Sequence, residues 1–333
     1  MKKVNHRFGF GLFFALVSAA ALGGCSGAAA PGEPAGQSDS EAASSLENCG
    51  TTLETDPTPE RVVTIKSTPL ELLLALGLED RIVGSAFLDG TVPESLAPAG
   101  WSVTELSEQV PGRELLLSVQ PDFVFAGWAS NLSAEGPGTR DQLEQLGIRS
   151  YISPAACDFG EETQAAMTFD DVFEMYAEIG DIFEVPERAE SLIAEQREQL
   201  KGLERVAEPI TALWYSSGED TPFVGGGTGA PNMIMEAAGL DNAAGDQAES
   251  WLSMSWEAFV SSDPDVIVLV NSPWNSADAK RQRIEAHPAA QSMRAVRAGN
   301  YISVDFATTE AGVRNVDAVE TIASGAIEIA RRG

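Results

Sequence analysis

Apolar residues recur at helical spacing over one long stretch of the chain, residues 167–206. Thr168 and Asp171 form a capping box at its start, and Pro186 restarts the helix without ending the apolar face. Glutamates between the apolar positions keep the opposite face polar. We therefore expect residues 167–206 to form a single long helical spine, a rigid connector between the segments before and after it.

On both sides of this spine, short β-branched runs alternate with helical ones, which is the order of a parallel α/β sheet. Before the spine, the pattern predicts strands at residues 61–66, 81–86, 123–126 and 149–153 and helices at residues 68–77, 115–119 and 141–146. After the spine, it predicts strands at residues 210–215, 266–270 and 301–304 and helices at residues 231–238 and 315–329. We predict an α/β fold with two Rossmann-like lobes of mostly parallel sheet, residues 48–166 and residues 207–333.

The first predicted helix carries a complete start signal. Thr68 is expected to be its N-cap, Pro69 its first helical residue, and Glu71 the residue that completes a capping box. Gly77 is expected to end it.

One segment of each lobe aligns with the other without gaps. Residues 114–125 and residues 257–268 share a leading glutamate, a serine, a Pro-Asp pair and the apolar strand that follows. Equivalent positions in two similarly built lobes explain this match. We expect Glu114 and Glu257 to occupy the same place in the two lobes, each at the start of a short helix.

The N-terminus combines three basic residues, an apolar run at residues 8–22 and a cysteine at position 25. The run is shorter than the ~20 apolar residues that a membrane-spanning helix needs, so residues 1–25 are interpreted as an export signal. The small residues directly before Cys25 match the lipobox of bacterial lipoproteins. We expect Cys25 to be lipidated and to anchor the protein on the extracytoplasmic face of the cell membrane.

Residues 26–47 consist mainly of Gly, Ala, Ser, Pro and Glu, and a segment with so little to bury is expected to be a flexible tether. Once Cys25 carries lipid, Cys49 and Cys157 are the remaining cysteines. An oxidising compartment favours a disulfide between them, and two buried free thiols are the alternative.

The formal net charge of −29, without any run of Lys and Arg, argues against a nucleic-acid partner, because phosphates must be neutralised by clustered cations. His287 is the only histidine beyond the export signal, so a zinc or copper site built on imidazole is not expected. The chain also has no G-x-S-x-G or H-E-x-x-H motif. We expect no metal, no cofactor and no enzymatic activity.

Ligands of open parallel sheets bind beyond the carboxyl ends of the strands, so the residues just past each predicted strand are candidates for a binding site. Tryptophans are concentrated there; burial in a core is the alternative for each ring. The candidate ligand-binding residues are Lys66, Ser67, Thr68, Trp128, Asn131, Trp214, Tyr215, Gly227, Gly229, Trp251, Trp256, Trp274 and Arg314. They predict a ligand cleft between the lobes, with aromatic faces that hold a planar organic molecule.

The glycine-rich run at residues 225–229 has three interpretations. Its bare amides before a helix can cradle a phosphate or carboxylate, or the run can be a flexible hairpin. A dinucleotide fingerprint of the form GxGxxA is the third, but an exported chain is not expected to meet a nicotinamide pool. Lys66 and Arg314 are cations that could pair across the cleft, with solvated surface positions as the alternative.

The ordered series of motifs from Cys49 to the C-terminus resembles the cobalamin and iron-siderophore class of ABC-transporter substrate-binding proteins. The lipobox, RVVTIKST followed by LELLLALGL, the PDFV and PDVIV strands and the helical spine carry this resemblance. Within the class, the runs GWASN, SPAAC, LWYSSG, GAPNMIM and TEAGVRN resemble a subgroup proposed to bind a precursor of the deazaflavin redox coenzyme. A deazaflavin would offer a planar ring to the tryptophans and a phosphate-bearing tail to Lys66, Arg314 or the glycines. Ferric siderophores and cobalamin are the competing ligands.

The resemblance implies a monomeric lipoprotein that captures a small anionic or aromatic ligand between its lobes and delivers it to a permease dimer with its ATPase. In such proteins, one glutamate per lobe before the Pro-Asp strand meets basic residues of the permease, and Glu114 and Glu257 match these positions. The alternative role of each glutamate is to favour its own helix N-terminus. An exported enzyme of unrecognised type acting in the same cleft is the alternative function.

Overall fold

The computed structural model describes residues 45–157 and 165–332, which belong to one compact unit. Our predictions for the export signal, for lipidation at Cys25 and for most of the tether at residues 26–47 lie outside these residues. Every helix in the described part of the chain is too short or too polar to span a lipid bilayer.

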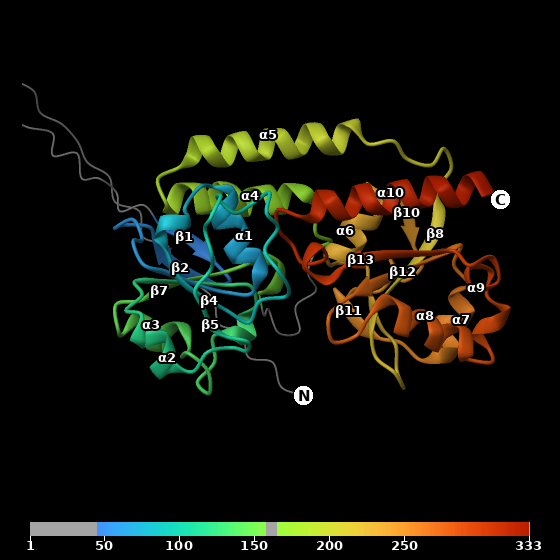
Figure 1. Cartoon of the computed structure of the whole chain (residues 1–333), viewed down its shortest axis with the longest axis horizontal. Coiled ribbons are helices and arrows are strands. Elements are labelled where there is room, and N and C mark those ends of the chain that lie inside the picture. The colour runs from blue at the N-terminus through green and yellow to red at the C-terminus, as the bar shows by residue number, and fades with distance from the viewer. Residues whose placement is uncertain (1–44, 158–164, 333) are drawn as a thin grey trace, which may run out of the picture. The chain divides into compact units, whose positions relative to one another are not determined.

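The N-terminal lobe is built on a parallel sheet with the strand order β5-β4-β3-β6-β7, of which β4, β5 and β7 are labelled in Figure 1. Its central strands β3 (Val62–Ile65) and β6 (Phe123–Ala126) are buried along their whole length, as expected of a sheet covered on both faces. The other elements are β4 (Ile82–Ala86), β5 (Glu105–Ser107), β7 (Arg149–Ile152), α1 (Ser67–Ala75), α2 (Arg113–Ser118), α3 (Arg140–Glu144) and the 3-10 turns η1 (Glu79–Arg81), η2 (Ala129–Asn131) and η3 (Pro154–Ala156).

A β-hairpin precedes this sheet. Strands β1 (Ser45–Asn48) and β2 (Thr51–Glu54) pair antiparallel, so regular structure begins within the last residues that we assigned to the tether. The Asn48 side chain holds the hairpin against β7, because it donates to the carbonyl of Ile152 at 2.8 Å and accepts from its N–H at 2.9 Å.

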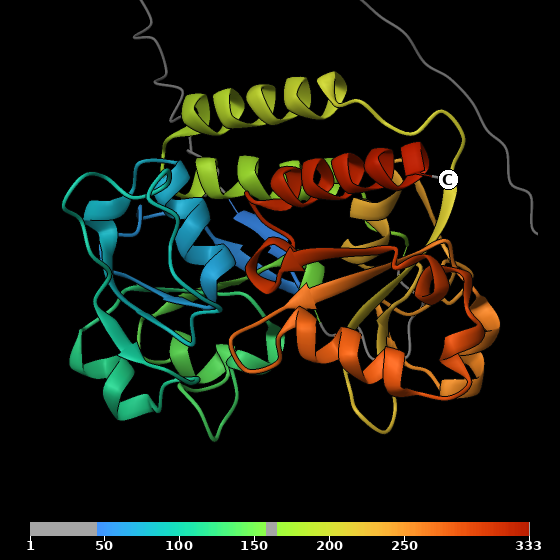
Figure 2. The ribbon, with the colours of Figure 1, turned by 45° about the vertical axis from the view of Figure 1, so that its right-hand side comes forward.

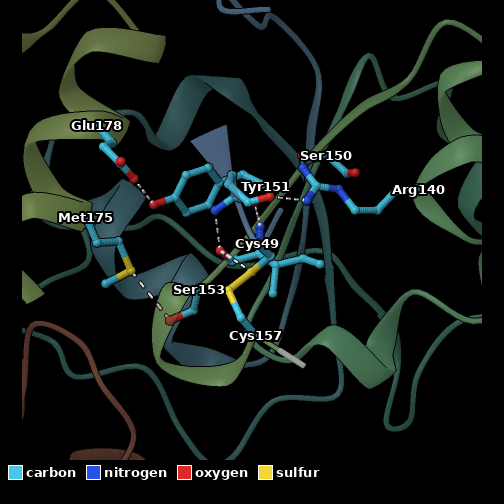
Figure 3. The surroundings of a disulfide bond; sticks show 10 residues. Cys49, Arg140, Ser150, Tyr151, Ser153, Cys157, Met175 and Glu178 are labelled. Atoms are coloured by element: carbon cyan, nitrogen blue, oxygen red, sulfur yellow. Dashed lines mark hydrogen bonds between the residues drawn. A yellow bond between two sulfur atoms is a disulfide. The ribbon is translucent and has the colours of Figure 1, made fainter. Parts of the chain in front are cut away.

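A disulfide between Cys49 and Cys157 ties this hairpin to the residues that follow β7, which confirms the predicted bond (Figure 3). In the same region, the hydroxyl of Tyr151 donates to Glu178 of the next helix. The start of the lobe and its last strand are therefore fixed to each other and to the helix behind them.

The C-terminal lobe contains a mixed sheet. Strands β8 (Ile210–Ser217), β12 (Val266–Asn271) and β13 (Tyr301–Asp305) run parallel, with β12 in the centre. On the other side of β8, β9 and β11 add antiparallel pairs and β10 adds a parallel one. The other elements are β9 (Phe223–Gly225), β10 (Leu240–Asn242), β11 (Trp251–Ser253), α6 (Ala230–Ala237), α7 (Trp256–Ser262), α8 (Ala277–Ala286), η4 (Ala290–Ser292), α9 (Arg294–Ala298), η5 (Phe306–Thr308) and α10 (Asn315–Arg332).

The two lobes place their matching segments equivalently. Helix α2 leads into β6, which pairs with the first strand of its sheet, and α7 leads into β12, which pairs with β8 in the same way. Glu114 and Glu257 are each the second residue of their helix, and both are exposed. The structure confirms that the two glutamates are equivalent in the two lobes.

The stretch at residues 167–206 is not the single continuous helix that we predicted. It forms α4 (Phe169–Ile182) and α5 (Pro186–Gly202), which are separated by a turn where Glu184 has a positive φ of 55°. Pro186 occupies the first position of α5, where its missing N–H costs no helical hydrogen bond. The proline therefore starts a new helix in a new direction.

The two helices run antiparallel. Gly180 faces Ala189 across the turn, and further along the hydroxyl of Tyr176 donates to Gln196 at 3.4 Å. The predicted capping box at Thr168 is confirmed at the start of α4. Helix α5 is thus the helix that leads from one lobe to the other, and Figures 1 and 2 show it beside α4 and α10.

The predicted capping box of the first helix is wrong. Helix α1 begins at Ser67, one residue before Thr68, and its N-cap Lys66 makes no capping hydrogen bond with its side chain. The side chain of Glu71 instead binds Arg314 of the other lobe. A glutamate at this position can either complete a capping box or form a long-range ion pair, and Glu71 forms the ion pair.

Removing the disulfide is expected to destabilise the fold. In protein that lacks Cys25, Cys49→Ser with Cys157→Ser opens a loop whose ends lie 108 residues apart, and the free energy of unfolding should fall by about 3 to 5 kcal/mol. Urea unfolding measures this loss. Reductant should lower the stability of the parent protein and leave the double variant unchanged, whereas a variant as stable as its parent would contradict the expectation.

Candidate ligand-binding site

A cavity of about 620 Å³ lies beyond the carboxyl ends of strands from both sheets. Trp128 and Ser153 line it just after β6 and β7, and Ser217 and Phe306 line it at the ends of β8 and β13. This is where open parallel sheets bind their ligands, and the volume suits a small organic molecule.

Aromatic rings from both lobes line this cavity. Trp128 comes from the N-terminal lobe, and Phe306, Phe223 and Trp251 come from the C-terminal lobe. Phe223 and Trp251 stack with ring centroids 5.7 Å apart and planes 11° apart. Hydroxyl groups make up much of the remaining lining: Thr68, Ser130, Ser216, Ser250 and Thr309.

Lys66 lies buried beneath Trp128 and does not present a free charge to the cavity. Its ammonium pairs with Asp89 and lies 4.0 Å from the ring centroid of Trp128 and 4.5 Å from that of Phe87. Ser67 completes the network, since its N–H donates to the Asp89 carboxylate and its hydroxyl accepts from the Asp89 N–H. Lys66 is 2% exposed and has a φ of 86°, a strained backbone for lysine at the end of β3.

Glu310, in the loop between β13 and α10, is a cavity residue that we did not predict. Its Oε2 accepts a hydrogen bond of 2.8 Å from the indole Nε1 of Trp128, which joins this loop to the N-terminal lobe. Burial raises the pKa of the Glu310 carboxyl, while the hydrogen bond from Trp128 and the charge of Lys66 oppose that rise. The sequence feature that could have identified Glu310 as a site residue is its position shortly after the last predicted strand, inside the run TEAGVRN.

A second polar contact joins the same loop to the N-terminal lobe. The guanidinium of Arg314 donates two hydrogen bonds, of 2.9 and 2.8 Å, to the two carboxylate oxygens of Glu71. Glu71 is 1% exposed, and burial raises its pKa to about 7 although Arg314 lowers it. The charge of Arg314 is therefore engaged by Glu71, and its role in ligand binding stays a prediction.

The glycine-rich run forms a tightly packed strand-to-helix turn. The N–H groups of Gly226 and Gly227 donate to the carbonyls of Ser250 and Gln247, at 3.0 and 2.9 Å. A Cβ on Gly227 would lie 2.2 Å from the carbonyl oxygen of Gly245, so only glycine fits there. The amides of Gly226 and Gly227 are therefore occupied, whereas Gly229, at the start of α6, lines the cavity, and its role in ligand binding stays a prediction.

Of the predicted ligand residues, Thr68, Trp128, Gly229 and Trp251 line the cavity. Asn131 supports it indirectly, because its side chain accepts from the Trp128 N–H at 3.0 Å. Trp274, 64% exposed, packs edge-on against the cavity residue Phe306 with ring centroids 5.3 Å apart.

Three other predicted aromatic residues are not part of the cavity lining. Trp214 and Tyr215 are fully buried, and the Tyr215 hydroxyl donates to the carbonyl of Gly218. Trp256 stacks on His287 with centroids 4.4 Å apart. Successive residues of a strand point to opposite faces, so a position at a strand end does not determine whether a ring reaches the cavity.

The prediction also missed two aromatic cavity residues. Phe306 lies two residues after the strand predicted at residues 301–304, and the strand-end rule applied without a preference for tryptophan would have found it. Phe223 lies on β9, a three-residue strand with no periodic signal of its own. In the described residues, no cluster of three or more His, Cys, Asp or Glu side chains could hold a metal ion.

The fold, with a cavity between its two lobes, is that of a two-lobed binding protein, and the sequence comparisons support this class. The family described as "Periplasmic binding protein" matches residues 62–308, so the chain belongs to this family. It is 26% identical to the uncharacterized ABC transporter substrate-binding lipoprotein YvrC of Bacillus subtilis, over 92% of this chain and 93% of that protein.

Two further relatives carry more specific names. A cobalamin-binding protein of Halobacterium salinarum is 28% identical over 79% of this chain and 69% of its own length. The crystal structure of an ABC-type Fe3+-hydroxamate transport system from Saccharomonospora viridis superposes with a TM-score of 0.71. It is 26% identical, and the match covers 85% of this chain and 98% of that one.

The inter-lobe ion pair is expected to contribute to stability. At pH 8, above the raised pKa of Glu71, Glu71→Ala leaves the guanidinium of Arg314 largely buried without its carboxylate, and the free energy of unfolding should fall by about 3 kcal/mol. Urea unfolding measures this change. The control Glu285→Ala, which removes the exposed pair with Arg281, should change it by less than ~1 kcal/mol.

The contribution of Glu71 to the stability of the fold should decrease as the pH rises. Because the pKa of Glu71 is raised in the folded protein, its protonation favours folding, and this contribution is lost as the pH rises from about 4.5 through about 7. The Glu71→Ala variant should lack this component. An unchanged pH profile of stability in the variant would show that Glu71 does not titrate in this way.

Proposed function

We propose that this protein is the extracytoplasmic component of an ABC importer and that its ligand is a precursor of the deazaflavin redox coenzyme. The observation that carries the ligand assignment is the cavity, where aromatic rings of both lobes stand among hydroxyl side chains. A flat polycyclic ring would stack on Trp128 and on the Phe223–Trp251 pair. A hydroxyl-rich chain attached to the ring would meet the serines.

The charges around the cavity favour this ligand over an anionic iron chelate. Lys66 is paired with Asp89, and Arg314 with Glu71. The described residues of the lining include no Lys, Arg, His or Tyr side chain that could neutralise or ligate such a chelate. We assign a phosphate-bearing tail to the serine and threonine hydroxyls, which donate to phosphate oxygens as well as to hydroxyl groups.

We further propose that the protein is a monomer anchored to the cell membrane through lipid on Cys25 and that it docks on a permease dimer with its ATPase. Glu114 and Glu257, exposed and equivalent in the two lobes, would meet basic residues of the two permease subunits. Each glutamate also lies in the first turn of its helix, where a negative charge is favourable, so the docking role needs a separate test.

Ligand binding should quench tryptophan emission. Titration with the deazaflavin precursor is expected to give saturable quenching, and Trp128→Ala should weaken binding by about 0.5 to 1.5 kcal/mol because a stacking face is lost. Trp256→Phe, which changes a ring packed on His287 outside the cavity, is the matched control and should bind as the wild type does. Calorimetry with a ferric siderophore or cobalamin that shows saturable binding, together with no response to the deazaflavin, would overturn the ligand assignment.

Permease docking predicts a loss of uptake without a loss of folding. Glu114→Lys with Glu257→Lys should abolish ligand uptake by cells and leave the unfolding midpoint and the ligand affinity nearly unchanged, because surface charges at a docking face act mainly on association. Glu187→Lys with Glu190→Lys, which reverses exposed charges in the first turns of α5, is the control and should transport normally. Normal uptake by the Glu114 and Glu257 variant would leave only the helix-terminus role.

A further inference from the structure

Of the described residues that line the cavity, only Glu310 carries a charge. One carboxylate oxygen, Oε2, accepts from the indole Nε1 of Trp128 at 2.8 Å. Among the described residues, no other side chain donates to this carboxylate, and no cation forms an ion pair with it. A partly buried carboxylate in the wall of a cavity has acceptor sites left for further hydrogen-bond donors, which a ligand can supply.

The nearest cation cannot supply that donor. The Lys66 ammonium pairs with Asp89 and is covered by the rings of Trp128, Phe87 and Phe306, with the Trp128 centroid 4.0 Å away. Its charge lowers the pKa of Glu310 through space, but burial, the largest effect, raises it. The Lys66 ammonium is thus bound to Asp89 within the wall of the cavity and does not donate to Glu310.

Trp128 fixes the direction from which a ligand meets Glu310. Its backbone N–H is held by Asn131, its ring packs edge-on against Phe87 at 5.9 Å and over the ammonium of Lys66, and its Nε1 is held by Glu310. The Nε1 hydrogen bond lies in the plane of the indole, so Glu310 stands at the edge of the ring. A planar molecule stacked on Trp128 would therefore direct its own edge towards this carboxylate.

We propose that Glu310 determines ligand specificity by accepting a hydrogen bond from an N–H at the edge of the ring that stacks on Trp128. The chemical class that fits is a neutral fused aromatic with an imide-like N–H, and a ring that carries a carboxylate or phosphate at this edge is excluded by charge repulsion. This inference rests on the proposed function, and it identifies the N–H edge of the ring as the part of the ligand that the protein recognises.

The test uses four probes and one conservative variant. The probes are the deazaflavin precursor, riboflavin, which shares the imide edge, and the derivative of each that is methylated at the imide nitrogen. Glu310→Gln keeps an oxygen that can accept from Trp128 Nε1 but removes the charge. Glu328→Gln, at an exposed position of α10, is the control and should bind as the wild type does.

For the probes with a free N–H, Glu310→Gln should lower the affinity about 10- to 100-fold, the effect of losing a hydrogen bond to a charged acceptor. Methylation should lower the wild-type affinity by a similar factor, and the variant should not distinguish the methylated probes from the free ones. The wild-type affinity should also decrease as the pH is lowered and Glu310 takes up a proton. Lys66 and Asp89, the charged groups that face Glu310, remain in the variant, whose affinity should not follow this profile.

The outcomes separate the inference from the proposed function. Equal losses for free and methylated probes in Glu310→Gln would mean that Glu310 only positions Trp128, which overturns the inference while the deazaflavin assignment stands. Binding of riboflavin through its N–H without binding of the deazaflavin precursor would support the inference and overturn the proposed ligand. A wild-type protein that binds none of the four probes would reject both.

Discussion

Burial of the Lys66 ammonium is the interaction on which the wall of the cavity depends. A lysine that is 2% exposed must have a counter-ion and further favourable contacts, because removing its charge from water is costly. Asp89 supplies the charge, and the ring of Trp128 covers the ammonium. The same ring then presents its N–H to Glu310 of the other lobe. One buried charge is therefore connected, through Trp128, to the acidic group of the cavity.

The contacts that shape the cavity also hold the two lobes together. The loop between β13 and α10 carries Phe306, which lines the cavity, Glu310, which binds Trp128, and Arg314, which binds Glu71. A ligand that interacts with this loop therefore acts on the segment that links the lobes. A ligand changes a conformational equilibrium through contacts that differ between the states, and the contacts named here all come from residues 306–314.

Sequence patterns located most of the regular structure because burial in a parallel sheet leaves a periodic signal. The predicted strands coincide with β3, β4, β6, β7, β8, β12 and β13 to within a few residues, and the match between the two lobes correctly paired Glu114 with Glu257. The prediction of one continuous helix was wrong at Pro186. A proline at the first position of a helix is compatible with a helix that continues in the same direction and with one that runs back antiparallel. The site was predicted only in part: the strand-end rule found Trp128 and Trp251 but not the partners of Lys66 and Glu71. Asp89 lies 23 residues from Lys66 and Arg314 lies 243 residues from Glu71, and the sequence pattern does not determine which charged residues will pair.

The surface of the protein and its cavity both carry negative charge, and this charge affects which molecules can bind. With a net charge of −29, the chain repels anions over the ~8 Å range that physiological salt leaves unscreened, and Glu310 extends the same sign into the cavity. An anionic group at the edge of the ring would thus be repelled by Glu310, whereas a neutral ring edge with an N–H donor would be attracted to it. A permease surface that bears basic residues would experience the outer field as attraction. Negative charge could therefore act in two places, on the surface towards a basic partner and in the cavity, where Glu310 is the charged residue among the described lining residues.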